Sequence, residues 1–127
     1  MDEDWQAELI ARVGRAIRRV SVQSVVISES VAGRFGMHPT DLEALDLISL
    51  AGPLPAGELA AAIGLSSGAA TALIDRLERA GYVVREADPL DRRRVLVRHV
   101  PEAVAPIAAV YRSLEGRMGT LWAEFDE

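Results

Sequence analysis

The stretch LPAGELAAAIGLSSGAATALIDRLERAGYVVREADPLDRRRVLVRHV, residues 54–100, decides the fold of this chain. It begins with a short helix, which Gly64 is expected to end because glycine adopts positive φ without steric cost. Ser66 or Ser67 then offers a side-chain oxygen that caps a second helix. Apolar residues at helical spacing predict the buried sides of the two helices: Leu59, Ala62 and Ile63 in the first, and Ala70, Leu73, Leu77 and Ala80 in the second.

Two segments with the composition of β-strands follow the second helix, at residues 82–86 and 95–100. The segment between them, residues 87–94, has proline and aspartate in turn-favouring places and ends in three arginines. A short third strand is expected at Leu54-Pro55. The sequence therefore predicts a mainly α fold with a small β-ribbon (α+β), arranged as a winged helix-turn-helix.

This order of elements indicates a DNA-binding protein. A helix-turn-helix presents the start of its second helix to the major groove, and small side chains there let the backbone approach base edges and phosphates. The free amide groups of that helix start favour a phosphate, and the ribbon would bring arginines to the negative potential of a minor groove. The candidate DNA-contacting residues are Ser66, Ser67, Gly68, Ala69, Thr71, Ala72, Asp75, Arg76, Asp91, Arg92, Arg93 and Arg94.

Two other interpretations stay open. The first is an ordinary helical hairpin followed by a β-hairpin with solvated charges. It would explain the three adjacent arginines taken alone, but not the ordered series of helix, turn, helix and ribbon. A winged-helix module that binds protein and not DNA is the competing function. An enzyme is remote, because the sequence has no catalytic motif, and no cofactor or metal is expected. His99 is the only other histidine, which is too few ligands for a metal site, so His38 is expected to be structural or to line a pocket.

Within residues 57–97 three motifs are specific in combination: DRLE at 75–78, GYV at 81–83 and DPLDRR at 88–93. On these motifs the chain resembles the MarR family of bacterial winged-helix transcription regulators. The resemblance implies that the helix starting near Ser67 enters the major groove. It also implies that Arg93 reaches the minor groove and that Asp91 orients it. Ala72 stands where family members often carry a polar or basic residue, which leaves few side-chain donors for base contacts.

Long helices are expected at both ends of the chain. β-branched residues leave a strand open at residues 20–31, but one long helix is preferred because no glycine or proline interrupts residues 15–32. The last helix is expected to begin between Pro101 and Pro106. The predicted parts are an N-terminal dimerisation helix at residues 1–34, a DNA-binding lobe at 35–100 and a C-terminal dimerisation helix at 101–127.

Apolar residues form a helical stripe near the N-terminus and a seam at steps of four and three near the C-terminus. The N-terminal stripe is expected to lie in the core of its own chain and also to meet a partner subunit. In the resembled family the first and last helices together form the dimer interface, and a further helix usually follows. Either the dimerisation unit here is expected to be short, or a further C-terminal helix is missing from this sequence. The expected interface residues are Trp5, Leu9, Val13, Leu114, Met118, Leu121, Trp122 and Phe125.

The composition agrees with a cytoplasmic, globular, DNA-binding homodimer. The chain has 127 residues, a net charge of −5 and no cysteine, which excludes disulfides and thiol redox chemistry. No apolar run is long enough to span a membrane. Four arginines lie together at residues 92–98, whereas acids gather at residues 1–8 and 115–127, so a basic face is expected. The resemblance implies a repressor that a small molecule releases from a pseudo-palindromic operator. The expected effector-pocket residues are Val20, Gln23, Met37, His38 and Tyr111.

Overall fold

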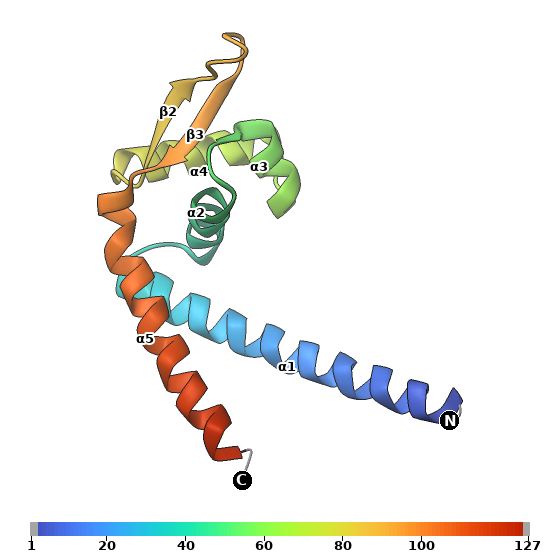
Figure 1. Ribbon diagram of the computed structural model, residues 1–127. Helices are drawn as coiled ribbons and strands as arrows, with labels where there is room; N and C mark the ends of the chain where they lie inside the picture. Colours follow the sequence, from blue (N-terminus) through green and yellow to red (C-terminus); the bar gives the residue numbers. More distant parts are fainter. Residues whose placement is uncertain (1–2, 126–127) are drawn as a thin grey trace.

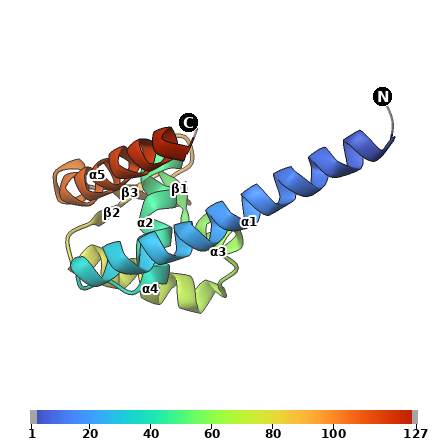
Figure 2. The same ribbon diagram turned by 90° about the horizontal axis from the view of Figure 1, so that it is seen from below.

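The computed structural model describes residues 3–125, without the side chains of residue 115 and residues 118–125. A small lobe lies at the meeting point of two long helices, and a β-hairpin points away from them (Figure 1). The first helix continues well beyond the lobe (Figure 2). The elements in chain order are α1 (Glu3–Arg34), α2 (Pro39–Ala51), β1 (Leu54–Pro55), α3 (Ala56–Ile63), α4 (Ser67–Arg79), β2 (Val83–Ala87), β3 (Val95–His99) and α5 (Pro101–Phe125).

The hydrophobic core is organised around α2. Leu42, Leu45 and Ile48 recur at helical spacing and have no exposed surface. Burying a side chain of this size contributes about 1.5–3 kcal/mol. The other core residues come from every neighbouring element: Val31, Ala32, Ala44, Leu59, Leu73, Ile74, Leu77, Val83, Val97 and Ile107.

The turn between α3 and α4 follows the predicted chemistry. Gly64 lies in the left-handed region, with φ 70° and ψ 32°, and ends α3. Ser66 is the N-cap of α4, and its Oγ accepts a hydrogen bond from the amide of Ala69 at 3.1 Å. A serine cap of this kind contributes about 1 kcal/mol. Local sequence therefore sets the start of α4 at Ser67. We call α4 the recognition helix, because it is the helix expected to enter the major groove.

β2 and β3 form the ribbon and belong to a three-stranded antiparallel sheet. Its order is β1-β3-β2, with Leu54 opposite Val97 and Val83 opposite His99. The short third strand at Leu54-Pro55 is thus confirmed. It ties the base of the ribbon to the helix-turn-helix.

Two predictions about the helices have clear outcomes. The single long N-terminal helix is confirmed. The predicted start of the last helix is wrong, because α5 begins at Pro101 itself and includes Pro106. Proline at the first helical position loses no hydrogen bond, since that amide has no partner within a helix. No single helix among the described residues is long and apolar enough to cross a membrane; α3 and α4, bent by 109°, meet that measure only as a pair.

Two predicted inward-facing alanines are wrong. Ala80 is exposed because α4 ends at Arg79, and Ile74 is buried in its place. Ala62 is also exposed, whereas Ala60 is buried on the other side of α3. The first correction follows from the end of α4, and the second moves the apolar stripe within α3.

The N-terminal stripe does not pack into its own chain. Val31 and Ala32 are the residues of α1 that are buried, at the end that meets the lobe. The expected intramolecular core is therefore wrong for the first two-thirds of α1, which extends beyond the lobe (Figure 2). The stripe residues are exposed: Trp5 by 58%, Leu9 by 45%, Val13 by 49%, Ile17 by 60% and Val20 by 53%.

Candidate nucleic-acid interface

The start of α4 is open, as a groove-binding helix requires. Its small residues are exposed: Ser66, Ser67, Gly68, Ala69, Thr71 and Ala72. A Cβ at Gly68 would meet nothing within 4 Å, so this glycine leaves free space outside the helix. The hydroxyl of Thr71 donates to the carbonyl of Ser67 at 2.9 Å, which commits the donor and leaves its methyl group outward for apolar contact.

The tip of the ribbon is a rigid turn built by two aspartates. The carboxylate of Asp88 accepts from the amide of Leu90 at 2.9 Å, and that of Asp91 accepts from the amide of Arg93 at 3.1 Å. Asp91 therefore holds the backbone of Arg93, and not its guanidinium as expected. The amide of Asp88 closes the turn by donating to the carbonyl of Arg94 at 3.0 Å.

The four clustered arginines are not equivalent. Arg94 reaches Glu58 of α3 at 3.4 Å, and Arg98 pairs with Glu86 across the ribbon at 3.0 Å. Arg92 and Arg93 are exposed and form no ion pair with any side chain that the structure describes. Two guanidinium groups at the tip are therefore available to phosphate.

Arg76 has a partner that the sequence did not indicate. Arg76 was expected to contact DNA, but it makes a bidentate pair with Asp41 of α2, with N–O distances of 3.0 and 2.8 Å. Asp41 is only 6% exposed, and the hydrogen bond to it is the main cause of a raised pKa at Arg76. The pair joins the recognition helix to the central helix of the core, and only its inward edge is shielded from water.

Because the two partners differ in exposure, their substitutions should differ in effect. Arg76→Ala leaves a buried carboxylate without a partner, whereas Asp41→Asn leaves a half-exposed guanidinium that water solvates. We expect Arg76→Ala to lower the melting temperature more than Asp41→Asn. Arg79→Ala is the matched control on the same helix, because Arg79 is exposed. Thermal unfolding followed by circular dichroism checks the order, and equal losses would contradict it.

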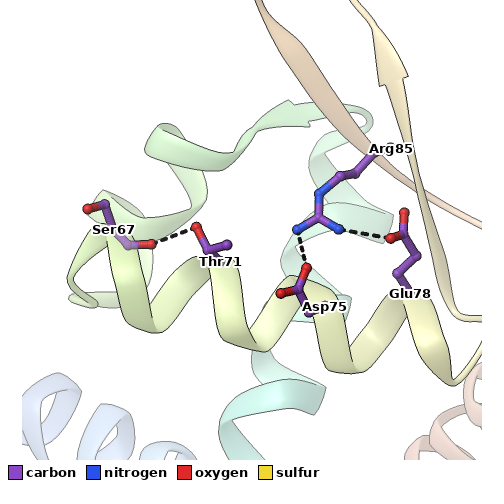
Figure 3. A network of polar contacts seen from close by, with 5 residues as sticks. All are labelled: Ser67, Thr71, Asp75, Glu78 and Arg85. Atoms are coloured by element: carbon purple, nitrogen blue, oxygen red, sulfur yellow. Dashed lines mark hydrogen bonds and ion pairs between the residues drawn. The ribbon is translucent and has the colours of Figure 1, made fainter.

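Asp75, a candidate for base contact, is paired with a residue outside the predicted site. Arg85 of β2 donates to Asp75 at 2.7 Å and to Glu78 at 2.9 Å (Figure 3). The hydrogen bond to Asp75 is the largest cause of a raised pKa at Arg85. Arg85 and Glu78 were missed because no local spacing shows that a strand residue faces a helix ten positions earlier.

The five effector-pocket candidates lie in two hollows. Met37 and His38 line a hollow of about 770 Å³ beside α4. Val20, Gln23 and Tyr111 line another, of about 240 Å³, between α1 and α5. His38 also caps α2, since its Nδ1 accepts from the amide of Thr40 at 3.2 Å. No group of three metal-ligating side chains occurs among the described residues.

Tyr111 connects the smaller hollow to the core of the lobe. Its hydroxyl donates to Asp46 of α2 at 3.0 Å. Burial is the main cause of a raised pKa at Asp46, and Tyr111 opposes that shift by donating to the carboxylate. Burial likewise raises the pKa of Tyr111. A polar link thus spans α5 and α2.

Three of the expected dimer-interface residues, Trp5, Leu9 and Val13, are exposed on α1. Leu114 is half-buried and packs against the core of its own chain. The remaining four side chains lie outside the described residues: Met118, Leu121, Trp122 and Phe125.

An open recognition helix beside an arginine-tipped ribbon defines a winged helix-turn-helix transcriptional regulator. A model of the MarR family matches residues 35–94. The uncharacterized HTH-type transcriptional regulator YcgE of Bacillus subtilis (strain 168) is 39% identical over 122 residues, which are 96% of this chain and 79% of YcgE. The chain belongs to the MarR family.

Solved structures agree with this assignment. The transcriptional regulator Tm0710 from Thermotoga maritima has a TM-score of 0.77 at 27% identity, over 90% of this chain and 80% of that one. A mutant of MarR from E. coli, complexed with operator DNA, has a TM-score of 0.62 at 25% identity, over 81% of this chain and 74% of that one.

Proposed function

We propose that this regulator represses transcription by binding a pseudo-palindromic operator as a homodimer. The observation that carries the proposal is the exposed, small-residue start of α4 beside a turn whose Arg92 and Arg93 form no ion pair within the described chain. The first suits a major groove and the second a minor groove. The operator complex of E. coli MarR, a structural neighbour, supports the same use of the fold.

The homodimer is supported by the apolar stripe on α1. Contiguous exposed apolar surface of this kind often marks an interface. In the proposed division, residues 1–34 and 101–127 dimerise and residues 35–100 bind DNA. Two lobes then present two recognition helices to two half-sites. Residence in the cytoplasm and the absence of catalysis belong to the same proposal.

A small molecule is proposed to control the affinity through the hollow between α1 and α5. Three of the five candidates line it, namely Val20, Gln23 and Tyr111. The Tyr111–Asp46 hydrogen bond then connects the bound molecule with α2, on which the recognition helix packs. Met37 and His38 are not part of this pocket and lie beside α4.

Binding-site selection tests the proposed function. Purified protein is mixed with a library of random duplexes, and the bound duplexes are sequenced over several rounds. An inverted repeat should emerge, and its affinity should fall steeply with salt because phosphate contacts release counterions. A winged-helix module for protein partners would instead select no sequence and shift no duplex at physiological salt.

The absence of cysteine makes a separate prediction about induction. With no thiol in the chain, peroxide should leave the affinity for the selected duplex unchanged over minutes. Fluorescence anisotropy before and after peroxide treatment measures this. Rapid release that dithiothreitol reverses would contradict the prediction, and hypochlorite, which oxidises methionine, is the control for slower damage.

A further inference from the structure

Among the ion pairs of the described residues, those that join the ribbon to the recognition helix are made by Arg85. Asp75 and Glu78 lie three residues apart on one face of α4, so their carboxylates are neighbours. Arg85, in the middle of β2, places Nη2 at 2.7 Å from Asp75 and Nη1 at 2.9 Å from Glu78 (Figure 3). We call these three residues the bracket.

The bracket lies where it can set an angle. The chain turns from α4 into β2 through Gly81, whose φ is 84°. Arg85 lies after that turn, and its side chain contacts α4, which precedes the turn. These contacts can restrict the angle between β2 and α4. Towards the start of α4, Ser67 and Thr71 continue the helical face that carries Asp75 (Figure 3).

The bracket contributes little to the core of the lobe. The side chain of Arg85 is 29% exposed, and those of Asp75 and Glu78 are each 43% exposed. Half-exposed ion pairs stabilise a fold only slightly. The base of the ribbon is also held by β1 and by the pair between Arg94 and Glu58, but those contacts join it to β1 and α3.

We propose that Arg85 is a positioning residue, which holds the ribbon at a fixed angle to α4 so that both meet DNA as one preorganised unit. The inference rests on the proposed function. A specific site requires the helix and the arginine tip at one spacing, so any freedom between them must be removed on binding. Non-specific binding tolerates several spacings and loses less. The bracket therefore adds to selectivity.

A charge-matched double variant separates geometry from electrostatics. Arg85→Gln with Glu78→Gln removes both ion pairs and leaves the summed charge of the three residues at −1, since Asp75 alone stays charged. Arg98→Gln with Glu86→Gln is the matched control, because it removes an ion pair of the same type within the ribbon. The probes are the duplex that the wild-type protein selects from a random library and a scrambled duplex of equal composition.

We expect the Arg85/Glu78 variant to lose about five-fold in affinity for the selected duplex, the factor that two exposed ion pairs represent. Its affinity for the scrambled duplex and its melting temperature should change little. The single substitution Arg85→Lys should lose less affinity for the selected duplex than the double variant, because an ammonium still pairs with one carboxylate at a time. Asp75→Asn, which keeps the pair between Arg85 and Glu78, should lose less.

Three results would overturn the inference: unchanged affinity for the selected duplex, equal losses for both duplexes, or an equal loss in the Arg98/Glu86 control. If the double variant does not fold, the Asp75→Asn and Arg85→Lys variants decide the matter by the same ratio. A wild-type protein that selects no duplex would refute the proposed function itself, and that outcome is separate from a bracket that proves irrelevant.

Discussion

Replacing Ile17 by aspartate should split the proposed homodimer and lower the affinity for the proposed operator by at least about 100-fold, the gain that linking two half-site contacts typically provides. Ile17 is 60% exposed in the chain alone, between Val13 and Val20 on the stripe of α1. In a two-fold dimer each substitution occurs twice, so two unpaired carboxylates would enter the interface. Burial of an unpaired charge costs several kcal/mol, about 3–5 for a fully buried group.

Ile17 is a sharper probe of this interface than Leu114. Leu114 packs against the core of its own chain, so an acid there would disturb folding as well as assembly. Ile17 lies outside that core, and the melting of the monomer should be unchanged. Sedimentation equilibrium measures the mass, and anisotropy measures binding to the selected duplex.

Val26 offers the control for the same experiment. It is also 60% exposed and β-branched, and it lies nine residues further on, which is half a turn from Ile17 on a helix of about 3.6 residues per turn. Val26→Asp should leave the dimer intact. A dimeric Ile17→Asp variant, or a monomeric Val26→Asp variant, would show that another face of α1 forms the interface.

Local sequence was sufficient for the elements that position the site. Gly64 and Ser66 act through their immediate neighbours, and the pairing of Leu54-Pro55 follows from a short run before a helix. The continuous helix over residues 15–32 of α1 also follows from a stretch without glycine or proline. Such features depend on backbone preferences within a few residues, which periodicity and turn chemistry express.

The ion-pair partners of the charged residues could not be predicted from the sequence. Arg76 pairs with Asp41, which is 35 residues earlier, and Arg85 pairs with α4 across a turn. Periodicity shows which side of a helix faces inward but not which acid of another element lies opposite. The exposure of the α1 stripe was hidden for a related reason, because a stripe for a partner and a stripe for the core have the same spacing.

At the tip of the ribbon, Arg93→Ala should be the most damaging of three arginine substitutions. Arg93 is exposed and forms no ion pair with any side chain that the structure describes, and its amide donates to Asp91 at 3.1 Å, which fixes the backbone of the turn that carries it. We expect a loss of about ten-fold in affinity for the selected duplex, within the range of one specific contact. The log–log salt slope should flatten by about one unit.

The neighbouring arginines serve as matched comparisons for Arg93. Arg92 is also exposed, but its amide has no such carboxylate contact among the described residues, and Arg94 is already near Glu58 at 3.4 Å. Arg92→Ala and Arg94→Ala should therefore cost less and alter sequence preference less. Thr71→Val should leave both the salt slope and the sequence preference nearly unchanged, because the hydroxyl of Thr71 donates within α4 and valine keeps a methyl group for apolar contact. Titration of all four variants over a salt series decides the order. An Arg93→Ala variant with wild-type affinity and slope would show that the ribbon does not contact DNA through Arg93.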